Sequence, residues 1–180
     1  MNDSSYSICC SNYSIKKLVF PEKKIGYASA ESKIFKTTDA GQNWIQCLSV
    51  TNDNISDFHF VNASTGYAIS GYYQPNIYKT IDSGTTWNII SILNSNVRKI
   101  CFVSENIGFA IGDYDLYKTT NGGTSWTQSF LNLYTSINDF VFINSQKGWV
   151  CTYNGIKSTT NGGTTWNDEF STLNLVNTNF

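Results

Sequence analysis

The sequence has one histidine, two prolines and a single arginine, Arg98, and it contains no long uninterrupted apolar run. A membrane-spanning helix needs roughly 18 consecutive apolar residues, so no transmembrane segment is expected. The formal net charge is −1, and the densest lysine group, at positions 16, 17, 23 and 24, surrounds Glu22. Nucleic-acid binding needs a concentrated basic surface, and none is visible. We therefore expect no nucleic-acid partner.

The five cysteines are an odd number, none has the spacing of metal ligands, and no calcium-binding loop motif occurs. We therefore expect no metal and no cofactor. Cys47, Cys101 and Cys151 fall inside expected strands, where a free thiol acts as a small buried apolar residue. The single histidine, His59, lies between two phenylalanines, which favours a strand position over a catalytic role. The first ten residues lack the basic start and apolar stretch of a signal peptide, so the localisation stays unknown.

An eight-residue pattern recurs four times, and we call its copies the box segments. They read TTDAGQNW (37–44), TIDSGTTW (80–87), TTNGGTSW (119–126) and TTNGGTTW (159–166). Before each one, an alternating apolar run leads to a glycine followed by an aromatic residue. These pairs are Gly26-Tyr27, Gly66-Tyr67, Gly108-Phe109 and Gly148-Trp149. Two motifs that share a period of about 40 residues indicate an internal structural repeat.

Each period resolves into four short strands joined by turns, with no segment of helical periodicity. This is typical of a propeller blade. We predict an all-β fold, a β-propeller of four four-stranded antiparallel blades, over a single domain of residues 1–180. The repeats cover about 12–51, 52–93, 94–133 and 134–173, and 174–180 begins a fifth blade. The chain is then an open arc from a six- to eight-bladed propeller, and its exposed end blades predict end-to-end self-association.

Each box segment is expected to form the turn between the third and fourth strands. The Asp or Asn accepts hydrogen bonds from backbone N–H groups two residues on, the glycine supplies a positive φ, and the threonine hydroxyl adds a bond. The tryptophan then packs on the blade and is largely buried. The residues with these structural roles are Asp39, Gly41, Trp44, Asp82, Gly84, Trp87, Asn121, Gly123, Trp126, Asn161, Gly163 and Trp166.

The pattern [ST]-x-[DN]-x-G-x-x-W resembles the Asp-box, or bacterial neuraminidase, repeat families. These include sialidases, xyloglucan-cleaving hydrolases, sortilin-type receptors and photosystem II assembly factors. The repeat form is most similar to the assembly factors and related secreted bacterial propellers, which implies an extracytoplasmic or secreted location. It also implies that the box segments lie on the face opposite the usual binding face.

The sequence departs from these families in three respects. Sialidases hold the substrate carboxylate with three arginines, and this chain has one, so we expect no sialidase activity. The basic partner-binding patch of the photosystem factors has no counterpart here. In the fourth repeat, Lys157-Ser158 replaces the aromatic-lysine pair seen at Tyr78-Lys79 and Tyr117-Lys118.

Propeller topology brings the turns between the second and third strands together with the links between blades, on the face that we call the top. Five tyrosines fall on these segments, among amides and carboxylates: Tyr72, Tyr73, Tyr114, Tyr134 and Tyr153. Aromatic rings offer stacking area and polar groups fix orientation, which suits a protein segment or a glycan as partner. The alternative is that the tyrosines merely cover their hairpins.

Asp57 and Asp139 occupy matching positions in the first strand of their blades, where Lys17 and Lys99 stand in the other two. Charges of alternating sign are expected to pair across the central channel, although two carboxylates also suit general acid/base catalysis. Asp113 and Asp115 form a second candidate pair.

Three functional hypotheses follow. We favour a non-catalytic module that binds a protein or glycan through its top-face loops, and we consider an enzyme less well supported. The alternatives are a fragment of a xyloglucanase-type glycoside hydrolase and a purely structural array in a cell-surface or secreted protein.

Overall fold

A computed structural model describes residues 13–93, 96–130 and 136–171, and within these ranges every regular element is a strand. The strands form four four-stranded antiparallel sheets, each in simple sequence order. Within the described ranges, no helix has the length and apolar character needed to cross a bilayer. Four-stranded meanders repeated in this way are the blades of a β-propeller, so the predicted fold class is confirmed.

The blades are numbered along the chain. Blade 1 contains β1 (Ile15–Val19), β2 (Gly26–Ala30), β3 (Lys33–Thr37) and β4 (Ile45–Ser49). Blade 2 contains β5 (Ile55–Phe60), β6 (Gly66–Ser70), β7 (Asn76–Thr80) and β8 (Asn88–Ile92). Blade 3 contains β9 (Lys99–Phe102), β10 (Gly108–Ile111), β11 (Asp115–Thr119) and β12 (Thr127–Phe130). Blade 4 contains β13 (Ile137–Phe142), β14 (Gly148–Thr152), β15 (Gly155–Thr159) and β16 (Asn167–Ser171).

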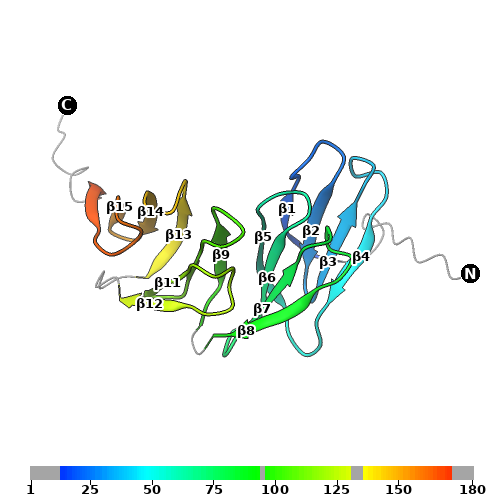
Figure 1. Ribbon diagram of the computed structural model, residues 1–180, viewed down its shortest axis with the longest axis horizontal. Helices are drawn as coiled ribbons and strands as arrows, with labels where there is room; N and C mark the ends of the chain where they lie inside the picture. Colours follow the sequence, from blue (N-terminus) through cyan, green and yellow to red (C-terminus); the bar gives the residue numbers. More distant parts are fainter. Residues whose placement is uncertain (1–12, 94–95, 131–135, 172–180) are drawn as a thin grey trace, which may run out of the picture. The chain divides into compact units, whose positions relative to one another are not determined.

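The chain divides into two compact units, Met1–Asn94 with blades 1 and 2 and Ser95–Phe180 with blades 3 and 4 (Figure 1). Each unit has its own core between its two blades. In the first, Tyr27 and Ile34 of blade 1 cluster with Ile55 and Phe58 of blade 2. The second core repeats this arrangement, with residues of β10 and β11 packed on residues of β13 and β14.

The glycine of each Gly-aromatic pair makes room for a phenylalanine at or just after the end of the first strand. A Cβ built on Gly66 lies 2.6 Å from the ring of Phe60, and one built on Gly108 lies 2.5 Å from the ring of Phe102. Phe20 lies on Gly26 and Phe142 on Gly148 in the same way. Real Cβ atoms do not approach other atoms this closely, so the ring position requires glycine.

The same phenylalanine joins neighbouring blades. The ring of Phe60 stacks on Tyr27 of the preceding blade, with 3.7 Å between centroids, and meets Trp87 of its own box segment edge-on. In the second unit, Phe142 stacks on Phe109 at 3.5 Å and meets Trp166 edge-on. The edge-on pairs have a favourable aromatic geometry, and the stacked rings cover apolar area between the blades. The two sequence motifs therefore meet at one inter-blade aromatic cluster.

In the box segments, the threonine hydroxyl holds the turn. Thr80 Oγ1 accepts hydrogen bonds from the backbone N–H of Gly84 at 2.9 Å and of Asp82 at 3.4 Å, and it donates to Asp82 Oδ1 at 2.8 Å. Asp82 Oδ1 accepts from the N–H of Thr86 at 2.8 Å. The other three segments make the same bonds.

One detail of the box prediction was wrong. The carboxylate or amide reaches the N–H four residues on, because the threonine hydroxyl already occupies the N–H groups nearer to it. The four tryptophans are partly exposed, with most of each side chain covered. Three of them turn the indole N–H to the carbonyl of their own box glycine, as Trp126 Nε1 does to Gly123 at 3.0 Å, which keeps the ring beside the turn. The positive φ is present, at 78° for Gly84 and 88–91° in the other three.

The box carboxylates predict a specific acid sensitivity. Hydrogen bonds from the backbone N–H groups of Asn43 and Thr86 lower the pKa of Asp39 and Asp82, respectively, to about 2. A carboxyl with a folded-state pKa below its ordinary value contributes stability that is complete above about pH 4 and is lost as the pH falls toward 2. Asp82→Asn should therefore flatten the fall of unfolding free energy between pH 4 and pH 2.

Blade 4 has asparagine at this box position, which shows that the turn accommodates the change Asp82→Asn. Asn161 keeps the bond from the N–H of Thr165 and donates its amide to Thr165 Oγ1 at 2.8 Å. The measurement is urea unfolding at a series of pH values from 2 to 5. The reverse change, Asn161→Asp, should steepen the same profile. Superimposable profiles for the wild type and both variants would contradict the role assigned to these carboxylates.

Candidate binding surface

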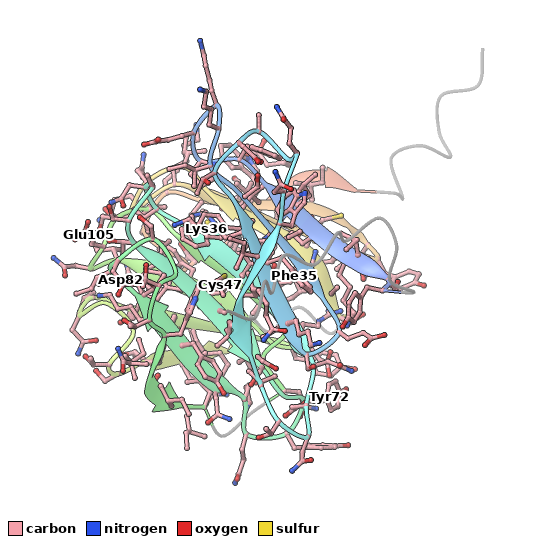
Figure 2. All side chains as sticks on the ribbon, turned by 90° about the vertical axis from the view of Figure 1, so that its right-hand side faces the viewer. Phe35, Lys36, Cys47, Tyr72, Asp82 and Glu105 are labelled. Atoms are coloured by element: carbon pink, nitrogen blue, oxygen red, sulfur yellow. The ribbon has the colours of Figure 1, made fainter. Side chains whose placement is uncertain are left out.

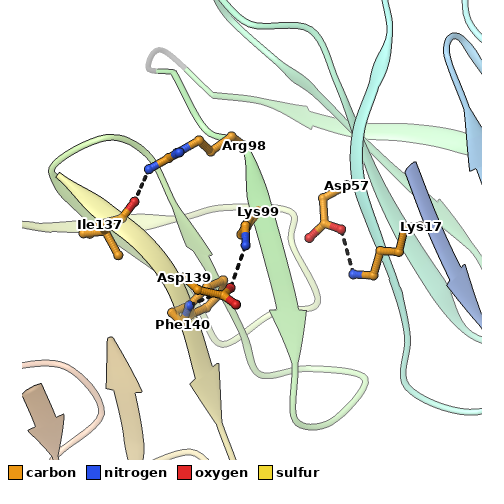
Figure 3. A network of polar contacts seen from close by, with 7 residues as sticks. All are labelled: Lys17, Asp57, Arg98, Lys99, Ile137, Asp139 and Phe140. Atoms are coloured by element: carbon orange, nitrogen blue, oxygen red, sulfur yellow. Dashed lines mark hydrogen bonds and ion pairs between the residues drawn. The ribbon is translucent and has the colours of Figure 1, made fainter. Parts of the chain in front are cut away.

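The charged positions of the innermost strands pair within each unit. Lys17 Nζ lies 2.7 Å from Asp57 Oδ1, and Lys99 Nζ lies 2.7 Å from Asp139 Oδ1 (Figure 3). Alternating charges do pair, but the prediction that they pair across the channel is corrected, because each pair joins the first strands of neighbouring blades. Asp57 is buried and Asp139 is exposed. In both pairs, Oδ1 of the aspartate accepts a hydrogen bond from an ammonium group.

The backbone carbonyls of Asp113 and Asp115 accept hydrogen bonds at the junction with blade 4 and within blade 3, respectively. The carbonyl of Asp113 accepts from the N–H of Ile137 at 3.0 Å, and the carbonyl of Asp115 accepts from Gly112 N–H at 3.0 Å. Arg98 Nε lies 3.5 Å from Asp113 Oδ1. Figure 3 shows its Nη2 donating to the carbonyl of Ile137. The single arginine of the chain thus fixes the start of β13 next to this turn. Sequence reasoning gave Arg98 no structural role.

The β6–β7 loop presents two tyrosines. Tyr72 and Tyr73 are 52% and 79% exposed, and their rings meet edge-on with centroids 4.9 Å apart. Figure 2 labels Tyr72 at the lower right of the molecule. In the first unit, the corresponding turn of blade 1 is the short Glu31-Ser32 pair, with no aromatic residue. The aromatic pair is therefore a feature of blade 2 and not of the repeat.

The other predicted tyrosines belong to the second unit. Tyr114 is 63% exposed at the β10–β11 turn, and Tyr153 is 77% exposed at the β14–β15 turn. Tyr134 lies outside the described residues. The structure brings Tyr72 and Tyr73 into contact, and it places Tyr114 and Tyr153 on the matching turns of their own blades.

Two cavities on the box side of the blades were not predicted. One, of about 400 Å³, lies between β3, β4 and the box turn of blade 2 and is lined by Lys36, Cys47 and Thr85, among others. Figure 2 shows Lys36 and Cys47 on these neighbouring strands. The other, of about 330 Å³, occupies the matching place in the second unit, beside Lys118. The sequence signal for them is an aromatic-lysine pair, present as Phe35-Lys36 at the first cavity and Tyr117-Lys118 at the second.

The lysines of these cavities are engaged by the protein itself. Lys36 Nζ donates to the carbonyl of Ser83 at 2.7 Å, and Lys118 Nζ to the carbonyl of Ser145 at 3.4 Å. Both ammonium groups also lie over the aromatic residue of the second strand of their own blade. Each lysine therefore links two blades, which is a structural role.

The cysteines of the described residues are free thiols. Burial raises the pKa of the Cys47 thiol to about 12, which favours the protonated form near neutral pH. By surface exposure, Cys47 and Cys101 are both half-buried, whereas Cys151 is exposed, which corrects the expectation that all three strand cysteines are buried. Within the described ranges, no cluster of three or more potential metal ligands occurs.

No family model and no curated protein matches the sequence. Solved structures do match it. YCF48 bound to D1 peptide is 14% identical over 92% of this chain and 71% of that one, with a TM-score of 0.57. YCF48 from Cyanidioschyzon merolae is 16% identical over 89% of this chain and 55% of that one, with a TM-score of 0.66.

The GH74 xyloglucanase from Xanthomonas campestris is 15% identical over 87% of this chain, with a TM-score of 0.68, and the match spans 32% of the enzyme. The chain thus spans about half of one of these proteins and a third of another. At such identities the likeness shows the fold alone. It places this chain among the β-propellers.

Proposed function

We propose that this chain is a set of Asp-box blades that acts as a non-catalytic binding module and holds a protein segment or a glycan on its top-face loops. One observation carries the proposal, the exposed Tyr72-Tyr73 pair on an anchored loop. Tyrosine offers a large, amphipathic contact area at a low cost in side-chain entropy, which is why it is frequent in binding sites.

Hydrogen bonds fix both ends of this loop. Gly71 donates its N–H to the carbonyl of Asn54 at 3.2 Å, and its own carbonyl accepts from Ser56 Oγ at 3.1 Å. At the other end, the carbonyl of the buried Pro75 accepts from the N–H of Leu93 at 3.1 Å. A loop held in place before binding loses little conformational freedom on binding, which favours affinity.

The comparisons set the order in which ligands are tested. YCF48, which shares the fold, is described bound to a peptide, so a protein segment is the first candidate. A GH74 xyloglucanase shares the fold as well, so xyloglucan cleavage is the second activity to test. The ion pairs of Asp57, Asp139 and Asp113 support the non-catalytic function, because they engage three of the four candidate carboxylates.

The test screens the full chain against an array of 15-residue peptides and against a glycan array. For a ligand found in either, the double variant Tyr72→Ala/Tyr73→Ala should bind at least tenfold more weakly without a change in the unfolding midpoint, because both side chains are exposed. Replacing both with phenylalanine keeps the stacking area and should retain most of the affinity. Ile89→Ala, an exposed change on β8, is the matched control and should bind like the wild type.

Two results would overturn the proposal. One is the absence of any ligand in both arrays, which would favour a purely structural array. The other is cleavage of xyloglucan by the wild-type chain that falls a hundredfold or more in Asp57→Asn, Asp139→Asn, Asp113→Asn or Asp115→Asn. That result would assign the chain to the hydrolases.

A further inference from the structure

Neighbouring blades pack through the same positions in both units. We call Ile55, Phe58 and Phe60 the leading face of blade 2, because these side chains of β5 pack on blade 1. Ile55 and Phe58 are fully buried there. In the second unit, the corresponding residues of β13 pack on blade 3 in the same way, and Ile137 is fully buried. A leading face is therefore an apolar surface made to be covered by another blade.

The leading face of blade 1 is exposed. It consists of Ile15, Leu18 and Phe20, at the positions of Ile55, Phe58 and Phe60 in blade 2. Ile15 is 43% exposed, Leu18 55% and Phe20 44%. Ile15 and Leu18 lie in β1, and Phe20 directly follows it. Together they form a contiguous apolar patch of the kind that soluble proteins usually keep covered.

Blade 4 exposes the opposite surface. We call Tyr27 and Ile34 the trailing face of blade 1, because they lie against the leading face of blade 2, and both are fully buried. At these positions blade 4 has Trp149, which is half-buried, and Ile156, which is 40% exposed. With Val141 they line an apolar cavity of about 220 Å³.

We propose that the leading face of blade 1 in one copy of this chain packs on the trailing face of blade 4 in a second copy. Phe20 then stacks on Trp149 of the other copy as Phe60 stacks on Tyr27 within one chain. Leu18 fills the apolar cavity next to Trp149 and Ile156. The two surfaces differ, so the contact is head-to-tail, and such contacts close into rings when the rotation between copies permits.

One charged position recurs in the first strand of every blade, and its charges agree with this junction. In chain order it is occupied by Lys17, Asp57, Lys99 and Asp139, and the residues of opposite sign pair at 2.7 Å within each unit. At the proposed junction, Asp139 of one copy is followed by Lys17 of the next, so the alternation continues. A junction with two lysines or two aspartates side by side would repel, and the sequence avoids it.

The test measures the mass of the full chain by light scattering over a range of concentrations. The wild type should form dimers or larger assemblies as the concentration rises. Leu18→Glu and Ile156→Glu each place a charge in the junction, and each should raise the concentration needed for association at least tenfold. Ile81→Glu, at a 70% exposed position of a box turn, is the matched control and should associate like the wild type.

Mixing the variants tests the head-to-tail geometry. The Leu18→Glu chain keeps an intact blade 4 face, and the Ile156→Glu chain keeps an intact blade 1 face, so an equimolar mixture should associate where neither variant does alone. A wild-type chain that remains monomeric at high concentration would overturn the proposal, as would association that both substitutions leave unchanged. The tyrosine loop is unaltered in all of these variants, so the outcome is independent of ligand binding.

Discussion

Phe142→Ala should lower the free energy of unfolding by about 3 to 5 kcal/mol, the range for removing a large buried aromatic side chain. Phe142 is 4% exposed. Its ring stacks on Phe109 with 3.5 Å between centroids, meets Trp166 edge-on and covers Gly148. The substitution therefore opens a cavity at the junction of blades 3 and 4 and removes three aromatic pairs at once, since Phe142 also meets Phe140 edge-on.

Phe20→Ala is the matched control for this variant. Phe20 holds the same position in blade 1, where it also covers its glycine and meets Trp44 edge-on, but it is 44% exposed. Its loss should cost about 1 kcal/mol or less, as expected of a substitution outside a packed core. Urea unfolding at low protein concentration, followed by tryptophan fluorescence, measures both values. Equal losses in the two variants would show that inter-blade stacking contributes nothing to stability.

Repetition made the blades predictable from sequence. Two motifs with a common period fix where strands and turns recur, and tight turns between short strands leave few topologies. The partner of each glycine was not predictable in this way. Phe60 precedes Gly66 by a loop, and the two meet only because β5 and β6 pair in a register that places Phe60 opposite Gly66. Periodicity shows that positions are equivalent, whereas contacts depend on strand register.

The same distinction explains the candidate site. The sequence placed Lys17 and Asp57 at equivalent positions of opposite sign, but equivalence does not say which neighbour a side chain reaches, and the pair forms between adjacent strands. It also placed Tyr72 and Tyr73 on a loop, where they are exposed. Their ring contact and the bonds that anchor the loop depend on local backbone geometry, as at Gly71 with its φ of 99°. The exposure of Cys151 depends on what covers the trailing face of blade 4, which no single repeat encodes.

Thr80→Val should lower the free energy of unfolding by about 2 to 4 kcal/mol, although valine has nearly the shape of threonine. Each buried polar group left without a partner costs about 1 to 3 kcal/mol. Thr80 is 1% exposed, and its hydroxyl accepts from two backbone N–H groups of the box turn and donates to Asp82. Valine would leave the buried N–H of Gly84 without its acceptor, in a turn whose glycine has a φ of 78°.

Thr80→Ser keeps the hydroxyl and removes one methyl group, so its cost should stay near 1 kcal/mol, about that of one buried methyl. Thr38→Val, at an exposed box position that makes none of these bonds, should leave the unfolding free energy within about 0.5 kcal/mol of the wild type. Urea unfolding of the three variants separates the contribution of the hydroxyl from that of side-chain shape. If valine is tolerated as well as serine, the turn is held without the threonine hydroxyl, by the bond between Asp82 and Thr86 and by its glycine and tryptophan. The recurrence of threonine at the first box position would then need an explanation other than hydrogen bonding.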